Sequence, residues 1–159
     1  MTADEVKALL KIYYDIPQMI AAEFATIRNC EAEKNRISLP PVNLSGLPGG
    51  KGLPGDRTAS MALANQARYY DDEIKACSHR IAELRAKRDW VRTALDTLDR
   101  TARQILGLAY IGPADPARRR GWRPPTWRQI AQKMSYSRNG AKQKAYSALF
   151  RLSKNPFIS

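Results

Sequence analysis

The sequence predicts an all-α fold, in which long N-terminal helices form a helical hairpin or coiled coil ahead of a cluster of shorter C-terminal helices. Apolar residues recur every three or four positions through most of the chain, which is the spacing of a helix with one buried face. Almost no segment shows the alternation of a strand. Four prolines and five glycines interrupt this pattern within residues 39–57.

Residues 4–36 are expected to form an amphipathic helix. Its apolar positions are spaced by three and four residues except near Pro17, and they are Val6, Leu10, Tyr13, Ile20, Phe24 and Ile27. Because proline lacks an N–H group and crowds the preceding turn, Pro17 should kink or split this helix. The Pro/Gly-rich segment 39–57 is then a loop or linker.

A long second helix is predicted from Thr58 to about Leu98. Ten of the eleven positions in two interleaved heptad rows are apolar, and Arg88 is the exception. One row is Leu63, Tyr70, Cys77, Leu84, Val91 and Leu98, and the other is Ala67, Ile74, Ile81, Arg88 and Leu95. Such a seam is typical of a coiled coil, whose partner is the helix at 4–36, a second copy of the chain, or both. The length of the seam favours a homodimer. The expected dimer seam is Leu63, Tyr70, Ile74, Ile81, Leu84 and Val91.

Charge is distributed very unevenly along the 159 residues. The net charge is +12, yet residues 1–115 hold 16 basic and 15 acidic groups, whereas residues 116–159 hold eleven basic groups and no acidic one. A basic module at one end of a chain is typical of proteins that bind a polyanion. A solvated basic face kept for solubility is the plainer alternative.

The C-terminal part predicts three helices. Thr97 or Asp99 can cap the first, which ends at Gly112-Pro113, and Thr126 can cap the second, which runs to Met134. Ser135-Tyr136-Ser137 forms a short turn, and Ser137 caps a final helix to about Lys154. Two short helices joined by a three-residue turn, the second polar and basic, are typical of a helix-turn-helix that reads duplex DNA.

The second helix would enter the major groove, where arginine and lysine recognise guanine and amides recognise adenine. The predicted base-contacting residues are Arg138, Asn139, Lys142, Gln143 and Tyr146. Ala131 and Ala141, in contrast, would let the two helices cross closely. The residues expected to contact phosphates or the minor groove are Arg118, Arg119, Arg120, Arg123, Thr126, Arg128, Lys133 and Ser137.

The segments 126–138, Thr-Trp-Arg-Gln-Ile-Ala-Gln-Lys-Met-Ser-Tyr-Ser-Arg, and 148–152, Ala-Leu-Phe-Arg-Leu, resemble region 4 of bacterial σ factors. More closely, with the preceding segment 98–111, they resemble phage late-transcription regulators of the RinA/ArpU type. The resemblance covers about residues 95–154. It implies a σ4-like DNA-binding domain at 95–159, a helical dimerisation or partner-binding region at 1–94, and activation of late packaging and morphogenesis genes in the cytoplasm of a bacterial host.

Two residues depart from the σ4 pattern. Gly140 lies in the first turn of the recognition helix, and Lys144 stands where σ4-type helices usually carry a buried aliphatic residue.

Other functions remain open, namely a small terminase subunit that recognises a packaging site and a σ-like protein that binds RNA polymerase.

The sequence contains no pattern typical of an enzyme. It has no Ser/His/Asp set, no phosphate-binding glycine loop and no metal-ligand spacing, so we expect no catalytic residues, no metal and no cofactor. Cys77 is interpreted as a small buried hydrophobe and His79 as a surface residue. No apolar run approaches the roughly 18 residues of a membrane-spanning helix, so no membrane contact is expected.

Overall fold

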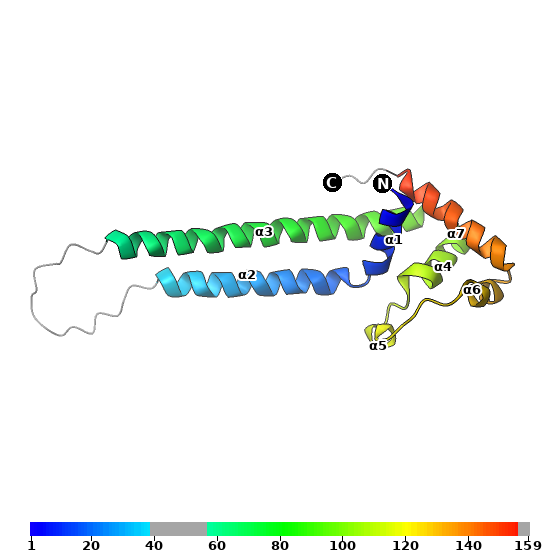
Figure 1. Ribbon diagram of the computed structural model, residues 1–159, viewed down its shortest axis with the longest axis horizontal. Coiled ribbons are helices and arrows are strands. Elements are labelled where there is room, and N and C mark those ends of the chain that lie inside the picture. The colour runs from blue at the N-terminus through cyan, green and yellow to red at the C-terminus, as the bar shows by residue number, and fades with distance from the viewer. Residues whose placement is uncertain (39–56, 156–159) are drawn as a thin grey trace, which may run out of the picture. The chain divides into compact units, whose positions relative to one another are not determined.

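The computed structural model describes residues 1–38 and 57–155. These residues form α-helices and one π-helical turn without any strand, so the all-α prediction is confirmed for them (Figure 1). The predicted loop at 39–57 lies outside the described residues except for its last position. The elements are α1 (Ala3–Ile12), α2 (Ile16–Ser38), α3 (Arg57–Asp96), α4 (Arg100–Leu106), η1 (Gly107–Ile111), α5 (Pro116–Arg119), α6 (Trp127–Met134) and α7 (Arg138–Ser153).

The predicted helix at 4–36 is split into α1 and α2, as the proline indicated. The break falls at residues 13–15, and Pro17 is the second residue of α2. Proline is well tolerated in the first turn of a helix, because the N–H groups there have no partner within the helix. Pro17 therefore begins a helix rather than interrupting one.

The chain forms two compact units, one of residues 20–82 and one that joins residues 1–19 to residues 83–159. The units therefore do not divide at residue 94, where the sequence suggested a boundary. The reason is that Val6 and Leu10 of α1 belong to the same apolar cluster as Val91 and Ala94 near the end of α3. The N-terminal helix is thus part of the C-terminal unit.

Within residues 20–82, α2 and α3 run side by side in opposite directions (Figure 1). Lys34 lies 2.5 Å from Asp71, and Arg80 lies 3.0 Å from Glu23, so the ion pairs follow an antiparallel register. Cys77 is buried, as predicted, and this burial, together with the nearby carboxylate of Glu23, raises the pKa of its thiol against the effect of the Arg80 guanidinium. The exposed His79 is a surface residue, also as predicted.

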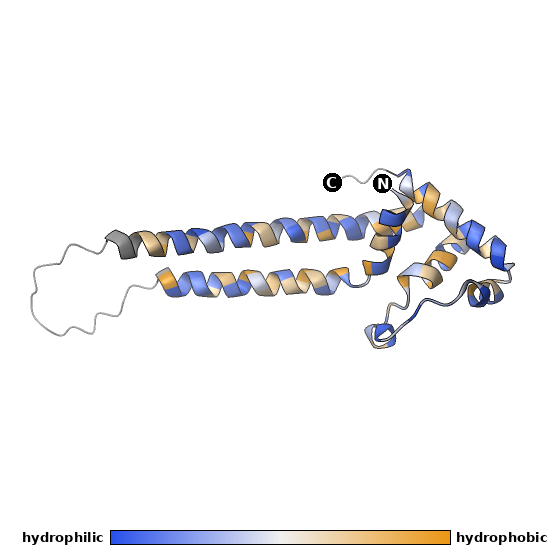
Figure 2. Ribbon diagram, in the orientation of Figure 1, coloured by the Kyte–Doolittle hydropathy of each residue, from blue (hydrophilic) through white to orange (hydrophobic). Residues whose placement is uncertain are grey.

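Much of the expected dimer seam is covered within the single chain. Ile81, Leu84 and Val91 are buried, whereas Tyr70 and Ile74 are partly buried and Leu63 is 47% exposed. Apolar and polar residues alternate along α3, as expected for a helix with one apolar face (Figure 2). The buried members of the seam are therefore not available to a second copy in this arrangement.

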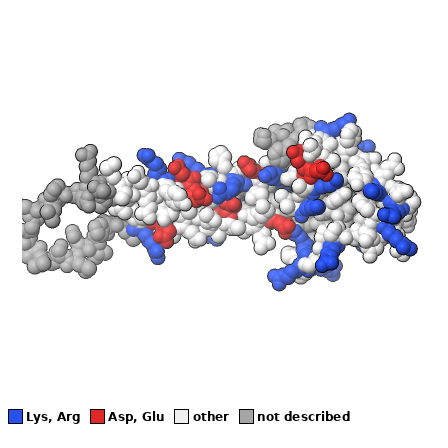
Figure 3. All heavy atoms as spheres, viewed as in Figure 1, with Lys and Arg blue, Asp and Glu red and all other residues white. Residues whose placement is uncertain are grey.

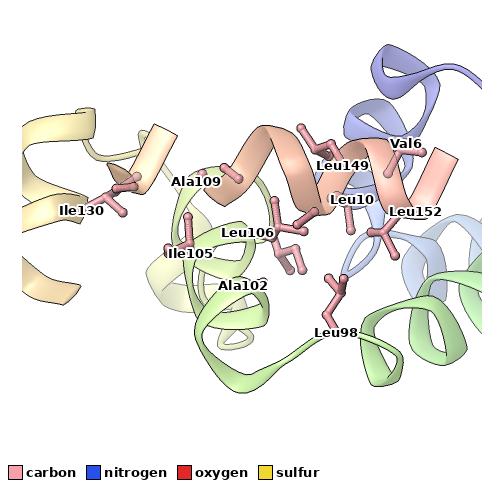
Figure 4. Packing of buried hydrophobic residues seen from close by; sticks show 14 of the residues in the cluster. Val6, Leu10, Leu98, Ala102, Ile105, Leu106, Ala109, Ile130, Leu149 and Leu152 are labelled. Atoms are coloured by element: carbon pink, nitrogen blue, oxygen red, sulfur yellow. The ribbon is translucent and has the colours of Figure 1, made fainter. Parts of the chain in front are cut away.

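The core of the other unit is built on one face of α7. Its buried residues are Ala141, Ala145, Ala148, Leu149 and Leu152. Around this face pack α1, α4 and α6, whose Leu10, Ile105 and Ile130 are each no more than 1% exposed (Figure 4). Three alanines on one face leave room for close helix contacts, so α7 can be enclosed on several sides at once.

The connection between α4 and α6 is more structured than expected. The cap of α4 is Asp99, one of the two residues that the sequence offered for this role, and after α4 the helix widens into the π-helical turn η1. The segment predicted as an Arg/Pro loop at 112–125 contains the single-turn helix α5. The side chain of Asp115 accepts a hydrogen bond from Ala117 N–H, and Pro116 occupies the first helical position, a combination that favours a helix start.

Leu149 and Phe150 offer a direct test of this core, because they are neighbours on α7 with opposite environments. Leu149 is fully buried, whereas Phe150 is 59% exposed. We expect Leu149→Ala to lower the free energy of unfolding by about 2–5 kcal/mol, since it leaves a cavity. Phe150→Ala should change it by no more than about 0.5 kcal/mol. Urea unfolding followed by circular dichroism measures both, and equal effects would contradict this placement of α7.

Candidate nucleic-acid interface

Helices α6 and α7 and the turn between them are defined by local hydrogen bonds. Thr126 caps α6 reciprocally with Gln129, and the Ser137 hydroxyl accepts the Gly140 N–H at 3.0 Å. Ser135 ends α6 in the left-handed conformation, with φ of 56°. Both predicted caps are confirmed, and the two helices are joined by residues 135–137.

Gly140 has a structural role at the start of α7. A Cβ atom at this position would lie 2.9 Å from the capping Ser137 oxygen. Glycine in a helix costs about 1 kcal/mol relative to alanine, but here it leaves room for the cap. The departure from the σ4 pattern is therefore compatible with a well-formed helix start.

All five predicted base-contacting residues are exposed on α7. At 100° per residue, Arg138, Asn139, Lys142, Gln143 and Tyr146 span roughly 140° of the helix surface. Ala141 and Ala145, which lie between them in the sequence, are fully buried. The first half of α7 thus presents hydrogen-bonding groups outward while its other face packs into the core.

Lys7 of α1 adds a positive charge beside this exposed face. Its ammonium lies 5.6 Å from the centre of the Tyr146 ring, and that of Lys142 lies 5.8 Å from the same ring. A hydrogen bond to Asp4, 2.8 Å away, raises the pKa of Lys7, so the ammonium is retained. The sequence did not indicate Lys7 as part of this face. Its only local signal is its position between Val6 and Leu10, and the helix that packs against α1 is distant in sequence.

Lys144 is explained by a charged partner at the N-terminal cap of α4. Its ammonium lies 3.3 Å from the carboxylate of Asp99, whose other role is to accept the Ala102 N–H as the cap of α4. Partial burial raises the pKa of Asp99, but these two interactions outweigh it and bring the pKa below its usual value. The lysine replaces an apolar contact with an ion pair at the edge of the core.

The arginine run at 118–120 is not uniform. The Arg119 side chain is 17% exposed, forms an ion pair with Asp15 and stacks over the Tyr14 ring at 5.5 Å. Arg118 is 81% exposed, with Asp115 at 3.6 Å, and Arg120 is exposed. Arg119 therefore ties α5 to the α1–α2 junction, whereas its two neighbours remain available to a ligand.

The other predicted phosphate-contacting residues lie on the same unit. Arg123, Arg128 and Lys133 are exposed and form no ion pair with any residue that the structure describes. Lys and Arg side chains gather on this unit in Figure 3. Thr126 and Ser137 are exposed but use their hydroxyl oxygens as helix caps. A run of cations thus borders α6 and α7.

Over residues 1–38 and 57–155, no group of His, Cys, Asp and Glu side chains has an arrangement that could hold a metal ion. In the same part of the chain, no helix combines the length and apolar character needed to cross a membrane. No family model, curated protein or solved structure matches the chain.

The structural role of Arg119 can be tested without any ligand. Arg119→Gln should lower the free energy of unfolding by about 1 kcal/mol, because the largely buried Arg119 side chain loses its ion pair with Asp15 and its contact with the Tyr14 ring. Asp15→Asn should have a similar effect. The double variant should lower the free energy of unfolding by less than the sum of the two single effects. The matched control is Arg118→Gln, which should change stability by no more than about 0.5 kcal/mol. Additive effects in thermal and urea unfolding would rule out the pairing.

Proposed function

We propose that this chain is a phage-type, sequence-specific DNA-binding transcriptional regulator, and that α6 and α7 act as its helix-turn-helix. The observation that carries the proposal is the two-sided character of α7. Its exposed side holds Arg138, Asn139, Lys142 and Gln143, whereas its alanines pack inward. A recognition helix needs both properties, since it must fit a major groove about 12 Å wide while anchored to a rigid support.

The surrounding charge supports duplex DNA as the ligand. Of the eleven basic residues in 116–159, Arg119 and Lys144 are held by Asp15 and Asp99, which are distant in sequence, whereas Arg118 pairs with the nearby Asp115 and stays 81% exposed. The nine other than Arg119 and Lys144 include Arg128 and Lys133 on α6, beside the proposed recognition helix. Cations on both sides of such a helix can hold the phosphate backbone while α7 reads the bases.

Activation of late genes is the part of the proposal that rests on the resemblance to phage regulators. A homodimer would also suit this role, because two recognition helices can then engage two half-sites. Within α3, the seam residues that keep exposed surface are Leu63, Tyr70 and Ile74, so we place the proposed contact there. Light scattering distinguishes this dimer from the ring of many copies expected of a terminase subunit.

The first test is the salt dependence of binding. If about six of the nine remaining cations contact phosphates, a plot of log affinity against log salt concentration should have a slope of roughly −5. Fluorescence anisotropy on a labelled duplex between 50 and 300 mM KCl measures it. A slope near zero, or no binding at the lowest salt, would contradict the proposal, whereas binding only to RNA polymerase would favour the σ-like alternative.

The second test separates base reading from backbone contact, after a preferred site has been selected from a random duplex library. Asn139→Ala and Gln143→Ala should each reduce the free energy of binding to that site by about 1–3 kcal/mol and relax the base preference at one or two base pairs. Arg118→Gln with Arg120→Gln should instead weaken binding to all sequences about equally. Arg119 is left intact because of its bond to Asp15.

Repeated library selection with each variant gives the readout. The assignment fails if the arginine variant changes the selected sequence while the Asn139 and Gln143 variants leave it unchanged. In that case the segment containing α5 reads the bases and α7 is a support.

A further inference from the structure

A cleft of 850 Å³ lies away from the exposed face of α7, between α4, η1, the segment 112–125 and α6. Its walls are largely apolar and include Leu108, Trp122, Ile130 and Met134. This volume falls within the range of roughly 300–1,000 Å³ that is typical of sites for small organic molecules. The helix-turn-helix proposal makes no use of this cleft.

Two glycines shape the cleft. Gly107 lines it at the junction of α4 and the π-helical turn, and a Cβ atom there would meet nothing within 4 Å. At Gly112, where φ is 76°, a Cβ atom would lie only 3.0 Å from the Trp122 ring. The absence of a side chain at Gly107 therefore leaves space open, and its absence at Gly112 lets Trp122 lie against the backbone as one wall. Single π-helical turns are frequent at functional sites.

The charged groups of the cleft all have one sign. Arg118, Arg123 and Lys133 line it, and no Asp or Glu does so among the described residues. Arg118 has a carboxylate nearby, Asp115 at 3.6 Å, but Arg123 and Lys133 form no ion pair with any described residue. An apolar cleft bordered only by cations favours a ligand that combines an apolar body with a negative group.

We propose that this cleft binds an amphipathic organic anion. A flat apolar body lies against Trp122 and the side chains of Leu108 and Met134, and a carboxylate, sulfonate or phosphate group binds Arg123 and Lys133. The site is distinct from the face of α7 and does not depend on DNA binding. Because α6 forms one wall and the same cations are proposed to contact DNA phosphates, an occupied cleft would also lower DNA affinity.

The probe for this site is 1-anilinonaphthalene-8-sulfonate, an aromatic anion whose fluorescence rises on binding to apolar surfaces. The full chain should bind it saturably, with one dominant site. Gly107→Leu should weaken binding at least tenfold, because its side chain occupies the cleft. The matched control Gly107→Ala adds a single carbon in open space and should change affinity by less than threefold. Unaltered affinity in the folded Gly107→Leu variant would overturn the proposal.

The preference for an anion is tested with a second probe, the neutral dye Nile red. The double variant Arg123→Gln, Lys133→Gln should weaken binding of the sulfonate at least fivefold and leave Nile red within twofold. An equal loss of affinity for both probes would show an apolar site without selectivity for anions, and would overturn the assignment of an anionic ligand. Circular dichroism and thermal unfolding establish that each variant is folded.

A measurement on the unaltered chain keeps the proposal testable if Gly107→Leu does not fold. Titration of the ¹⁵N-labelled protein with the sulfonate should shift the amide signals of Gly107 and Gly112 and the indole N–H of Trp122. Shifts confined to other residues, such as those around the exposed Phe150, would show that the probe binds elsewhere and overturn the assignment. DNA binding is measured separately, so failure of either proposal leaves the other unaffected.

Discussion

Close packing against the alanine face of α7 is the constraint on which the rest of this unit depends. Ala141, Ala145 and Ala148 are nearly or fully buried, and their small side chains allow other helices to approach the α7 backbone. Larger residues at these positions would hold α1, α4 and α6 away from it, since well-packed cores tolerate little added volume. The same packing fixes which side of α7 faces solvent, and so sets the orientation of the proposed DNA-reading residues.

The charges of the unit are divided between structure and surface. Arg119 and Lys144 are held by carboxylates distant in sequence, those of Asp15 at the α1–α2 junction and Asp99 at the cap of α4. Their neighbours Arg118 and Lys142 remain exposed. The basic residues concentrated in one segment therefore do not form one uniform binding surface, because some of them form ion pairs that stabilise the fold.

The segment between α4 and α6 belongs both to the proposed DNA interface and to the proposed ligand cleft. It carries the cations that border α6, and it lines a cleft with Gly107 and Trp122. A ligand in that cleft and a DNA backbone would compete for Arg123 and Lys133. Such competition would link occupancy of the cleft to DNA affinity through shared charges, without any large rearrangement of the helices.

The sequence by itself determined the helical class, the caps at Thr126 and Ser137, and the exposed polar face of α7, whereas it left Thr97 and Asp99 as alternatives for the cap of α4. These features depend on residues within a few positions of one another, so spacing and side-chain chemistry suffice to predict them. Most residues of the candidate site could therefore be predicted from the sequence.

Only the tertiary structure decided which distant residues meet. It packed α1 onto α7, which brought Lys7 beside Tyr146, and it withdrew Arg119 from the surface through Asp15. It also buried Ile81 within the chain, a residue whose heptad position fits a partner helix of either the same or a second chain. An apolar stripe shows that a face must be covered, but not by what, because the covering element is selected by the packing of the whole chain.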